Sequence, residues 1–114
     1  MIFSIGDHIE QIKNGTKTQT RRIAKEFGPY YQEAKKYGIS PGRRKTCIPD
    51  GVIRITSRSL ELRQDKISTE DALAEGGYTP EEYEALFERM YPNWRSRYAY
   101  KFVYLPNSSR NTTS

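Results

Sequence analysis

The spacing of apolar residues predicts short strands and helices that alternate along the chain. An apolar run at 2–5, followed by a glycine and Asp7, is typical of a strand that ends in a turn. Ile9 and Ile12 then fall three residues apart, which predicts one apolar face of a short helix. Asp7 can cap the start of this helix, and Gly15 follows its last turn as a stop signal.

The next part of the chain predicts a strand, a helix and a loop. The stretch 17–23 is rich in threonine and favours a strand. Pro29 suits the first position of a helix and Gly38 lies just past its end, so we expect a helix between them. Its buried side would consist of Tyr30, Tyr31, Ala34 and Tyr37. The stretch 39–46 contains Pro-Gly and three consecutive bases, which indicates an exposed loop.

Two further strands follow from alternating patterns. A Pro-Asp-Gly turn precedes 52–62, where Ile53 and Ile55 alternate with polar residues, as in a long strand. The last strand, 98–105, places four aromatic side chains on one face. These are Tyr98, Tyr100, Phe102 and Tyr104.

Two helices are predicted between these strands by their capping residues. Ser68 and Asp71 match a capping pattern for a helix that stops at Gly76, and Thr79 with Glu82 repeats the pattern for a second helix. The second helix carries apolar residues at i, i+3, i+4 and i+7, which we interpret as a core stripe. These are Tyr83, Leu86, Phe87 and Met90.

Strands and helices that alternate in this order predict a mixed α+β domain built on a small, curved sheet or barrel. The 114 residues match one domain in size. We therefore expect a single domain over 1–106, followed by a flexible polar tail at 107–114.

Charge is distributed unevenly along the chain, whose formal net charge is +5. Residues 1–66 sum to +7, residues 67–88 to −7 and residues 89–114 to +5. Two basic stretches that flank one acidic segment favour a positive face, which is typical of proteins that bind phosphate-bearing partners. The alternative is that the acidic segment simply neutralises its basic neighbours.

The remaining composition argues against several classes of protein. The single cysteine, Cys47, excludes an internal disulfide, and with one histidine, His8, no cluster has the spacing of a metal site. We expect no metal and no cofactor, and an ordinary packing role for both residues. No apolar run approaches the roughly 18 residues that span a bilayer. The start of the chain also lacks the features of a signal peptide, so we expect a cytoplasmic protein without a membrane partner.

The most distinctive segment is the run Gly-Thr-Lys-Thr-Gln-Thr-Arg-Arg at 15–22, which follows directly after the first predicted helix. Arginine can grip a phosphate or carboxylate in a bidentate way, and threonine adds hydroxyl donors. The alternative interpretation is an edge strand that its charges keep soluble.

This segment resembles the signature of the ASCH family, glycine-x-lysine-x-x-threonine-x-arginine, which is matched here by Gly15, Lys17, Thr20 and Arg22. The resemblance implies a PUA-like fold, a small mixed β-barrel with flanking helices. The chain departs from the family after its Pro-Gly turn, where Arg43 replaces a frequent aspartate and opens the basic triplet Arg43, Arg44 and Lys45.

Some ASCH proteins are similar to small amidohydrolases that deacylate N4-acetylcytidine, which implies catalytic roles for Lys17, Thr20 and Glu75. A threonine hydroxyl is a weak nucleophile, and lysine can activate it only if burial or a neighbouring cation lowers the lysine pKa. Glu75 would orient the lysine or protonate the leaving amine. Residues three apart on a regular strand point to opposite faces, so Lys17 and Thr20 converge only if Lys17 lies in the preceding turn or a bulge intervenes.

The interpretation we favour from the sequence is a module that binds RNA or a modified nucleoside in a basic cleft, with amidohydrolysis as the close alternative. Cations would contact phosphates and Phe3 or a tyrosine would stack on a base. The expected binding residues are Phe3, Ser4, Gly15, Arg21, Arg22, Arg43, Arg44 and Lys45. A ribonuclease ranks third, because the acid and base are hard to name. A protein-interaction adaptor would be indifferent to nucleosides.

Overall fold

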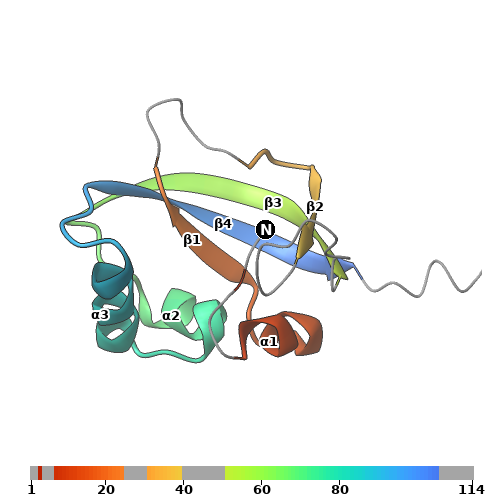
Figure 1. Cartoon of the computed structure of the whole chain (residues 1–114), viewed down its shortest axis with the longest axis horizontal. Coiled ribbons are helices and arrows are strands. Elements are labelled where there is room, and N and C mark those ends of the chain that lie inside the picture. Colours follow the sequence, from red (N-terminus) through yellow and green to blue (C-terminus); the bar gives the residue numbers. More distant parts are fainter. Residues whose placement is uncertain (1–2, 4–6, 25–30, 40–50, 106–114) are drawn as a thin grey trace, which may run out of the picture.

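The computed structural model describes residue 3 and residues 7–24, 31–39 and 51–105, which form one four-stranded antiparallel sheet and three helices (Figure 1). The strand order is β1-β4-β3-β2. The elements in chain order are α1 (His8–Asn14), β1 (Gln19–Ile23), β2 (Lys36–Ile39), β3 (Gly51–Leu62), α2 (Thr69–Gly76), α3 (Pro80–Met90) and β4 (Ser96–Leu105).

The two long central strands, β3 and β4, give the sheet its two faces. Side chains alternate between the faces, and a register shift between Ile55 and Ser57 adds one irregularity to the pairing. One face packs against Ile12 of α1 and against Phe3. The buried members of this core are Phe3, Ile12, Ile39, Ile53, Ile55, Tyr100 and Phe102.

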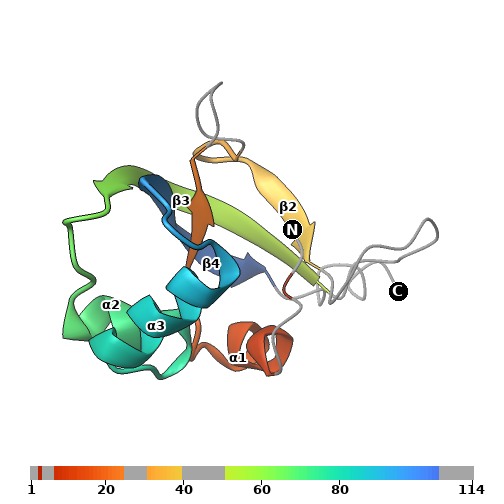
Figure 2. The same cartoon turned by 60° about the vertical axis from the view of Figure 1, so that its left-hand side comes forward.

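A second cluster forms where α2 and α3 pack together. Phe87 lies at its centre, with ring centroids 5.2 Å from Trp94 and 6.1 Å from Tyr83. The buried members of this cluster are Ile67, Ala72, Tyr83, Phe87 and Trp94. Figures 1 and 2 show α2 and α3 side by side under the β1 end of the sheet, far from β2.

Most of the predicted elements are confirmed, because their local signals agree with the packing. Ser68 Oγ accepts a hydrogen bond from the Asp71 amide, and Thr79 with Glu82 forms a complete capping box. The aromatic face of β4 is also confirmed, since its four aromatic side chains all pack with the first core. No helix in the described ranges is long and apolar enough to cross a membrane.

The helix predicted between Pro29 and Gly38 is wrong over its described part. From Tyr31 the chain runs through a turn, where Ala34 has a φ of 66°, and continues as β2. Tyr37 pairs with Ile53 of β3, and its ring contacts Tyr31 edge-on at 4.9 Å. Sheet pairing and aromatic contacts therefore override the helical spacing of the tyrosines.

The α+β class is confirmed, whereas closure into a barrel is not seen, because the sheet stays open over the described residues. Several predictions lie outside the described residues. These are the strand at 2–5 apart from Phe3, Tyr30, the loop after Ile39, and the tail at 107–114.

Two glycines at the end of α2 differ in what surrounds them. Gly76 has a φ of +145°, and a Cβ built there would lie 2.8 Å from Gln11 Oε1 and 3.1 Å from the Tyr78 ring. Gly77 has a φ of +83° and ends the helix, but a Cβ there would meet nothing within 4 Å. Gly76 therefore permits both the backbone conformation and the close approach of α1.

We expect Gly76→Ala to destabilise the protein more than Gly77→Ala. Positive φ alone costs about 1–2 kcal/mol for an alanine, and the clash at Gly76 adds roughly 1–3 kcal/mol. Urea denaturation of both variants checks this difference. Equal losses would show that Gly76 matters only for its φ angle.

Candidate functional site

Lys17 lies in the connection between α1 and β1, not in the strand. Gly15 adopts the left-handed conformation with a φ of 87° and ends α1. The Lys17 amide then donates to the Gln11 carbonyl, and the Thr18 amide donates to the Ala74 carbonyl. This path lets Lys17 and Thr20 face the same pocket, which is the first of the two solutions that the spacing allowed.

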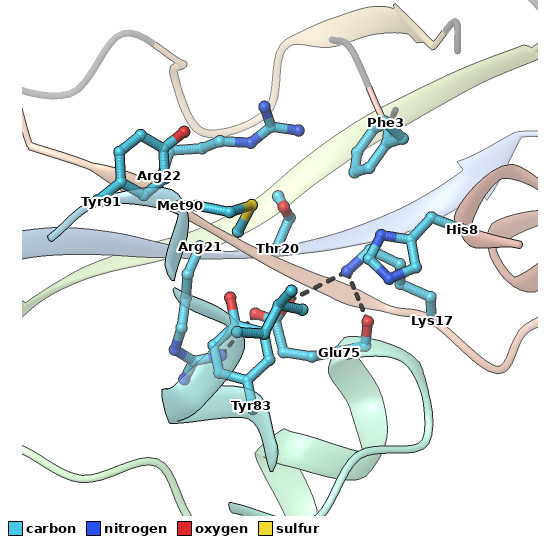
Figure 3. A pocket seen from close by; sticks show the side chains of 11 residues that line it. Phe3, His8, Lys17, Thr20, Arg21, Arg22, Glu75, Tyr83, Met90 and Tyr91 are labelled. Carbon is cyan, nitrogen blue, oxygen red and sulfur yellow. Dashed lines mark hydrogen bonds and ion pairs between the residues drawn. The ribbon is translucent and has the colours of Figure 1, made fainter. Parts of the chain in front are cut away.

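The pocket has a volume of about 240 Å³ and lies where β1, α2, α3 and Phe3 meet (Figure 3). In Figure 3 Thr20 is central, with Phe3 on one side and Tyr83 on another. The lining residues are Phe3, His8, Lys17, Thr20, Arg21, Arg22, Glu75, Tyr83, Leu86, Met90 and Tyr91.

Glu75 joins the two buried cations of this pocket. Lys17 Nζ donates to Glu75 Oε1 at 3.0 Å and to the Glu75 carbonyl at 2.6 Å. Arg21 Nη1 donates to Glu75 Oε2 at 2.7 Å. The side chains of all three residues are 1% exposed. Both carboxylate oxygens accept from cations, so Glu75 suits orientation of the lysine better than proton donation.

Arg21 is fully engaged by its neighbours. Nε and Nη2 bond the Glu61 carboxylate at 2.9 and 2.8 Å, and Nη2 also reaches Asp71 at 3.4 Å. Nη1 bonds Gln19 in addition to Glu75. These contacts use all five N–H donors of the guanidinium, which leaves none for a phosphate. We therefore reassign Arg21 from phosphate contact to positioning of Glu75.

The network continues from Glu61 to Arg97 of β4. Arg97 Nε donates to Glu61 Oε1 at 2.8 Å, and its two terminal nitrogens donate to Glu84 at 2.9 Å each. The guanidinium also lies 4.4 Å from the Trp94 ring centroid. Arg97 is fully buried, so its charge is balanced entirely by carboxylates and aromatic faces.

Burial lowers the pKa of Lys17 below 10.5, although Glu75 acts in the opposite direction. The charges of Arg22 and Arg21 lower it further. A lysine with a lowered pKa is a stronger candidate for a general base near neutral pH.

Tyr83 and His8 enter the pocket as neutral groups. Burial and the charge of Glu75 raise the pKa of Tyr83 well above 10, so its phenol remains a hydrogen-bond donor. Burial and the charge of Lys17 lower the pKa of His8 to about 4. His8 Nε2 lies 2.9 Å from the Tyr78 hydroxyl, which gives the buried imidazole a hydrogen-bonding partner.

The structure brings most of the predicted site residues together. Phe3 is buried in the first core, and the Arg22 guanidinium lies 4.9 Å from its ring centroid. Gly15 lies outside the pocket, in a second groove beside α1. Ser4, the basic triplet and Cys47 fall outside the described residues. Residues of the described ranges include no cluster of His, Cys, Asp or Glu that could hold a metal ion.

Sequence reasoning missed one wall of the pocket. Leu86 and Met90 line it instead of joining the buried core as predicted, and Tyr91 lies beside them. Their helical spacing with Tyr83 and Phe87 was correct, but spacing alone does not show which residues of the apolar stripe are buried in the core and which line a pocket. A pocket wall and a core stripe have the same sequence pattern.

We expect Glu75→Gln to destabilise the protein by about 3–5 kcal/mol, because it leaves the charges of Lys17 and Arg21 uncompensated in a buried site. Lys17→Met should cost markedly less, since Glu75 keeps Arg21 and methionine fills similar space. Urea denaturation measures both. Similar losses in the two variants would contradict a central role for Glu75.

Scans against protein-family models and curated proteins found no significant match. Among solved structures, an ASCH domain from Lactobacillus crispatus has a TM-score of 0.64 and 16% identity, covering 91% of this chain and 77% of that one. Protein EF3133 from Enterococcus faecalis, of the family DUF984, has a TM-score of 0.65 and 18% identity, covering 92% and 71%. At these identities the likeness concerns the fold, and the chain therefore has the fold of an ASCH domain.

Proposed function

We propose that the protein is an amidohydrolase that removes the acyl group from N4-acetylcytidine or a related acylated nucleoside. The observation that carries this proposal is the convergence of Lys17, Thr20 and Glu75 on one pocket, where burial lowers the pKa of Lys17. The fold supplies the frame for these residues but does not determine the reaction, which has to be argued from the site.

Thr20 is the nucleophile and Lys17 its base. Neutral Lys17 takes the hydroxyl proton as Thr20 Oγ1 attacks the amide carbonyl carbon. The C–N bond then breaks, the acyl group stays on Thr20 as an ester, and the protonated lysine returns its proton to the leaving amine. Water, activated by the same lysine, hydrolyses the ester and restores the hydroxyl. Carboxylic acid and the free nucleoside are the products.

The hydrogen bonds of Lys17 support this role. A neutral amine has two N–H groups and one lone pair, and Lys17 already points two bonds at Glu75. The lone pair is then directed away from Glu75 and is available for a proton. Lys17 and Thr20 both line the pocket, although no hydrogen bond joins these two described residues.

The size and walls of the pocket suit a single base. Its volume of about 240 Å³ lies just below the usual range of small-molecule sites, so it would admit one nucleobase and not a folded RNA. Phe3 offers an aromatic wall and Met90 an adaptable one. Because Lys17 and Arg21 are already balanced by carboxylates, an uncharged base suits the pocket better than a phosphate does.

A module that binds RNA or a modified nucleoside without turnover is the second candidate. The ASCH fold favours it, since PUA-like barrels also serve as RNA-binding units. A ribonuclease is less well supported, because His8 is held neutral by its low pKa and is bonded to Tyr78. Thus the one histidine of the chain is a poor acid for RNA cleavage.

We expect Thr20→Val to lower the release of cytidine from N4-acetylcytidine by at least about 100-fold, because it keeps the branched shape and removes the hydroxyl. Thr20→Ser keeps the hydroxyl and should retain most of the rate. Chromatography of the released cytidine measures both variants. Equal rates in wild type and Thr20→Val would exclude Thr20 as the nucleophile and shift support to the binding module.

The rate of deacylation should rise with pH as Lys17 loses its proton, with an apparent pKa below 10.5. Arg22→Gln removes a charge that lowers the pKa of Lys17, so the rising limb of kcat/KM should move to higher pH. Lys13→Gln, an exposed control outside the pocket, should leave the limb in place. If the rising limb of kcat/KM stays at the same pH in Arg22→Gln, a group other than Lys17 is the base.

A further inference from the structure

Three exposed cations of the sheet lie apart from the ion pairs that join the helices to it. Three of the seven acidic residues in the segment 67–88, Asp71, Glu75 and Glu84, bond the buried cations Arg21, Lys17 and Arg97. These helices cover only the β1 end of one sheet face (Figure 2). Among the described residues, no helix covers the β2 end of the same face, which carries cations from three adjacent strands.

Lys36, Arg54 and Lys101, which we call the basic sheet face, share one side of the sheet. Lys36 lies directly opposite Arg54, and Arg54 lies opposite Val103, two residues along β4 from Lys101. Opposite residues share a face, as do residues two apart on a strand. All three cations are exposed, and none forms an ion pair with another described residue.

Two features make this face more than scattered surface charge. Like charges directly opposite each other destabilise a sheet, and Lys36 faces Arg54 without an intervening acid. The described residues that the register places on this part of the face are Lys36, Gly38, Val52, Arg54, Ser57, Lys101, Val103 and Leu105, and none is acidic. Asp71 of α2 is close enough to Lys101 for their charges to interact, but its carboxylate is already bonded to Gln19 and Arg21.

A groove of about 330 Å³ shares one lining residue with the candidate active site and has another on this side of the sheet. Lys17 lines both the groove and the pocket, and Val103 lines the groove from the basic sheet face. Exposed Lys13 and Thr18 lie along it as well. A chain could therefore extend from the pocket through the groove and over the sheet.

We propose that the basic sheet face binds the phosphates of an RNA strand while one acylated nucleotide of that strand enters the pocket. The choice of RNA over another polyanion rests on the proposed function, because a nucleoside pocket and a phosphate-binding surface joined by a groove fit one polymer. The substrate is then an acylated residue within RNA, and the free nucleoside is a poorer substrate.

The test compares two triple variants by titration with a short single-stranded RNA at several salt concentrations. Lys36→Gln, Arg54→Gln and Lys101→Gln together alter the face, whereas Lys66→Gln, Arg89→Gln and Arg95→Gln remove three exposed charges elsewhere. The face variant should make the slope of log affinity against log salt shallower by about 2. Raising salt from about 50 to about 200 mM would then weaken wild type roughly twentyfold more than the face variant.

Three results would overturn the proposal. These are equal binding by the face variant and wild type, equal weakening in both triple variants, and displacement of RNA by polyglutamate of the same charge, which would indicate an acidic polypeptide as the partner. Circular dichroism of the exposed-site variants checks that each remains folded.

A second measurement separates this proposal from the deacylation reaction. With the face variant, kcat/KM should fall for an RNA that contains N4-acetylcytidine and stay unchanged for free N4-acetylcytidine. If wild type deacylates neither compound but RNA still binds through the basic sheet face, the result contradicts the proposed reaction and supports the proposed RNA-binding surface. If wild type deacylates both compounds and the face variant has the same kcat/KM for each, the result contradicts the proposed RNA-binding surface and supports the reaction.

Discussion

The structure depends on a chain of buried ion pairs that runs from Lys17 through Glu75, Arg21 and Glu61 to Arg97. Charged groups that leave water lose several kcal/mol of solvation each, so they are tolerated only with close, well-directed partners. These partners come from a helix and from a central strand, because Glu75 belongs to α2 and Glu61 to β3. The requirement to pair every buried charge therefore fixes how α2 and α3 dock on the sheet, more narrowly than apolar contacts alone would do.

The same network prepares the candidate site for chemistry. Arg21 holds one oxygen of Glu75, and the other oxygen holds Lys17, so the lysine is oriented by a carboxylate that cannot easily turn. Burial lowers the pKa of this lysine while the ion pair limits the shift. A base needs both a lowered pKa and a fixed direction, and a single buried carboxylate with two cations supplies both. The apolar wall on α3 completes the pocket, which Leu86 and Met90 line together with Thr20.

The basic residues fall into two groups with different physical roles. Arg21 and Arg97 are buried and satisfied by carboxylates, so they hold the fold and contribute little to the external field. Lys36, Arg54 and Lys101 are exposed, and their charge acts on the solvent side of the sheet. The net charge of +5 is not spread evenly over the molecule, because three acids of α2 and α3 pair with buried cations, whereas the exposed cations of the sheet form no ion pair with a described acid. Counting charges along the chain could reveal the excess but could not assign it to these two groups.

Local signals in the sequence determined the helix caps of α2 and α3, the long strand β3, the aromatic face of β4 and the glycine-to-arginine segment that carries Lys17 and Thr20. Such features depend on neighbours within a few residues, so the pattern contains them. Tertiary structure alone decided that Tyr37 lies in a strand, that Lys17 lies before β1 and not within it, and that Arg21 forms ion pairs with three carboxylates. The partners in each case lie far away in sequence. The pairing of buried charges and of strands stabilises the fold only after those distant segments have come together.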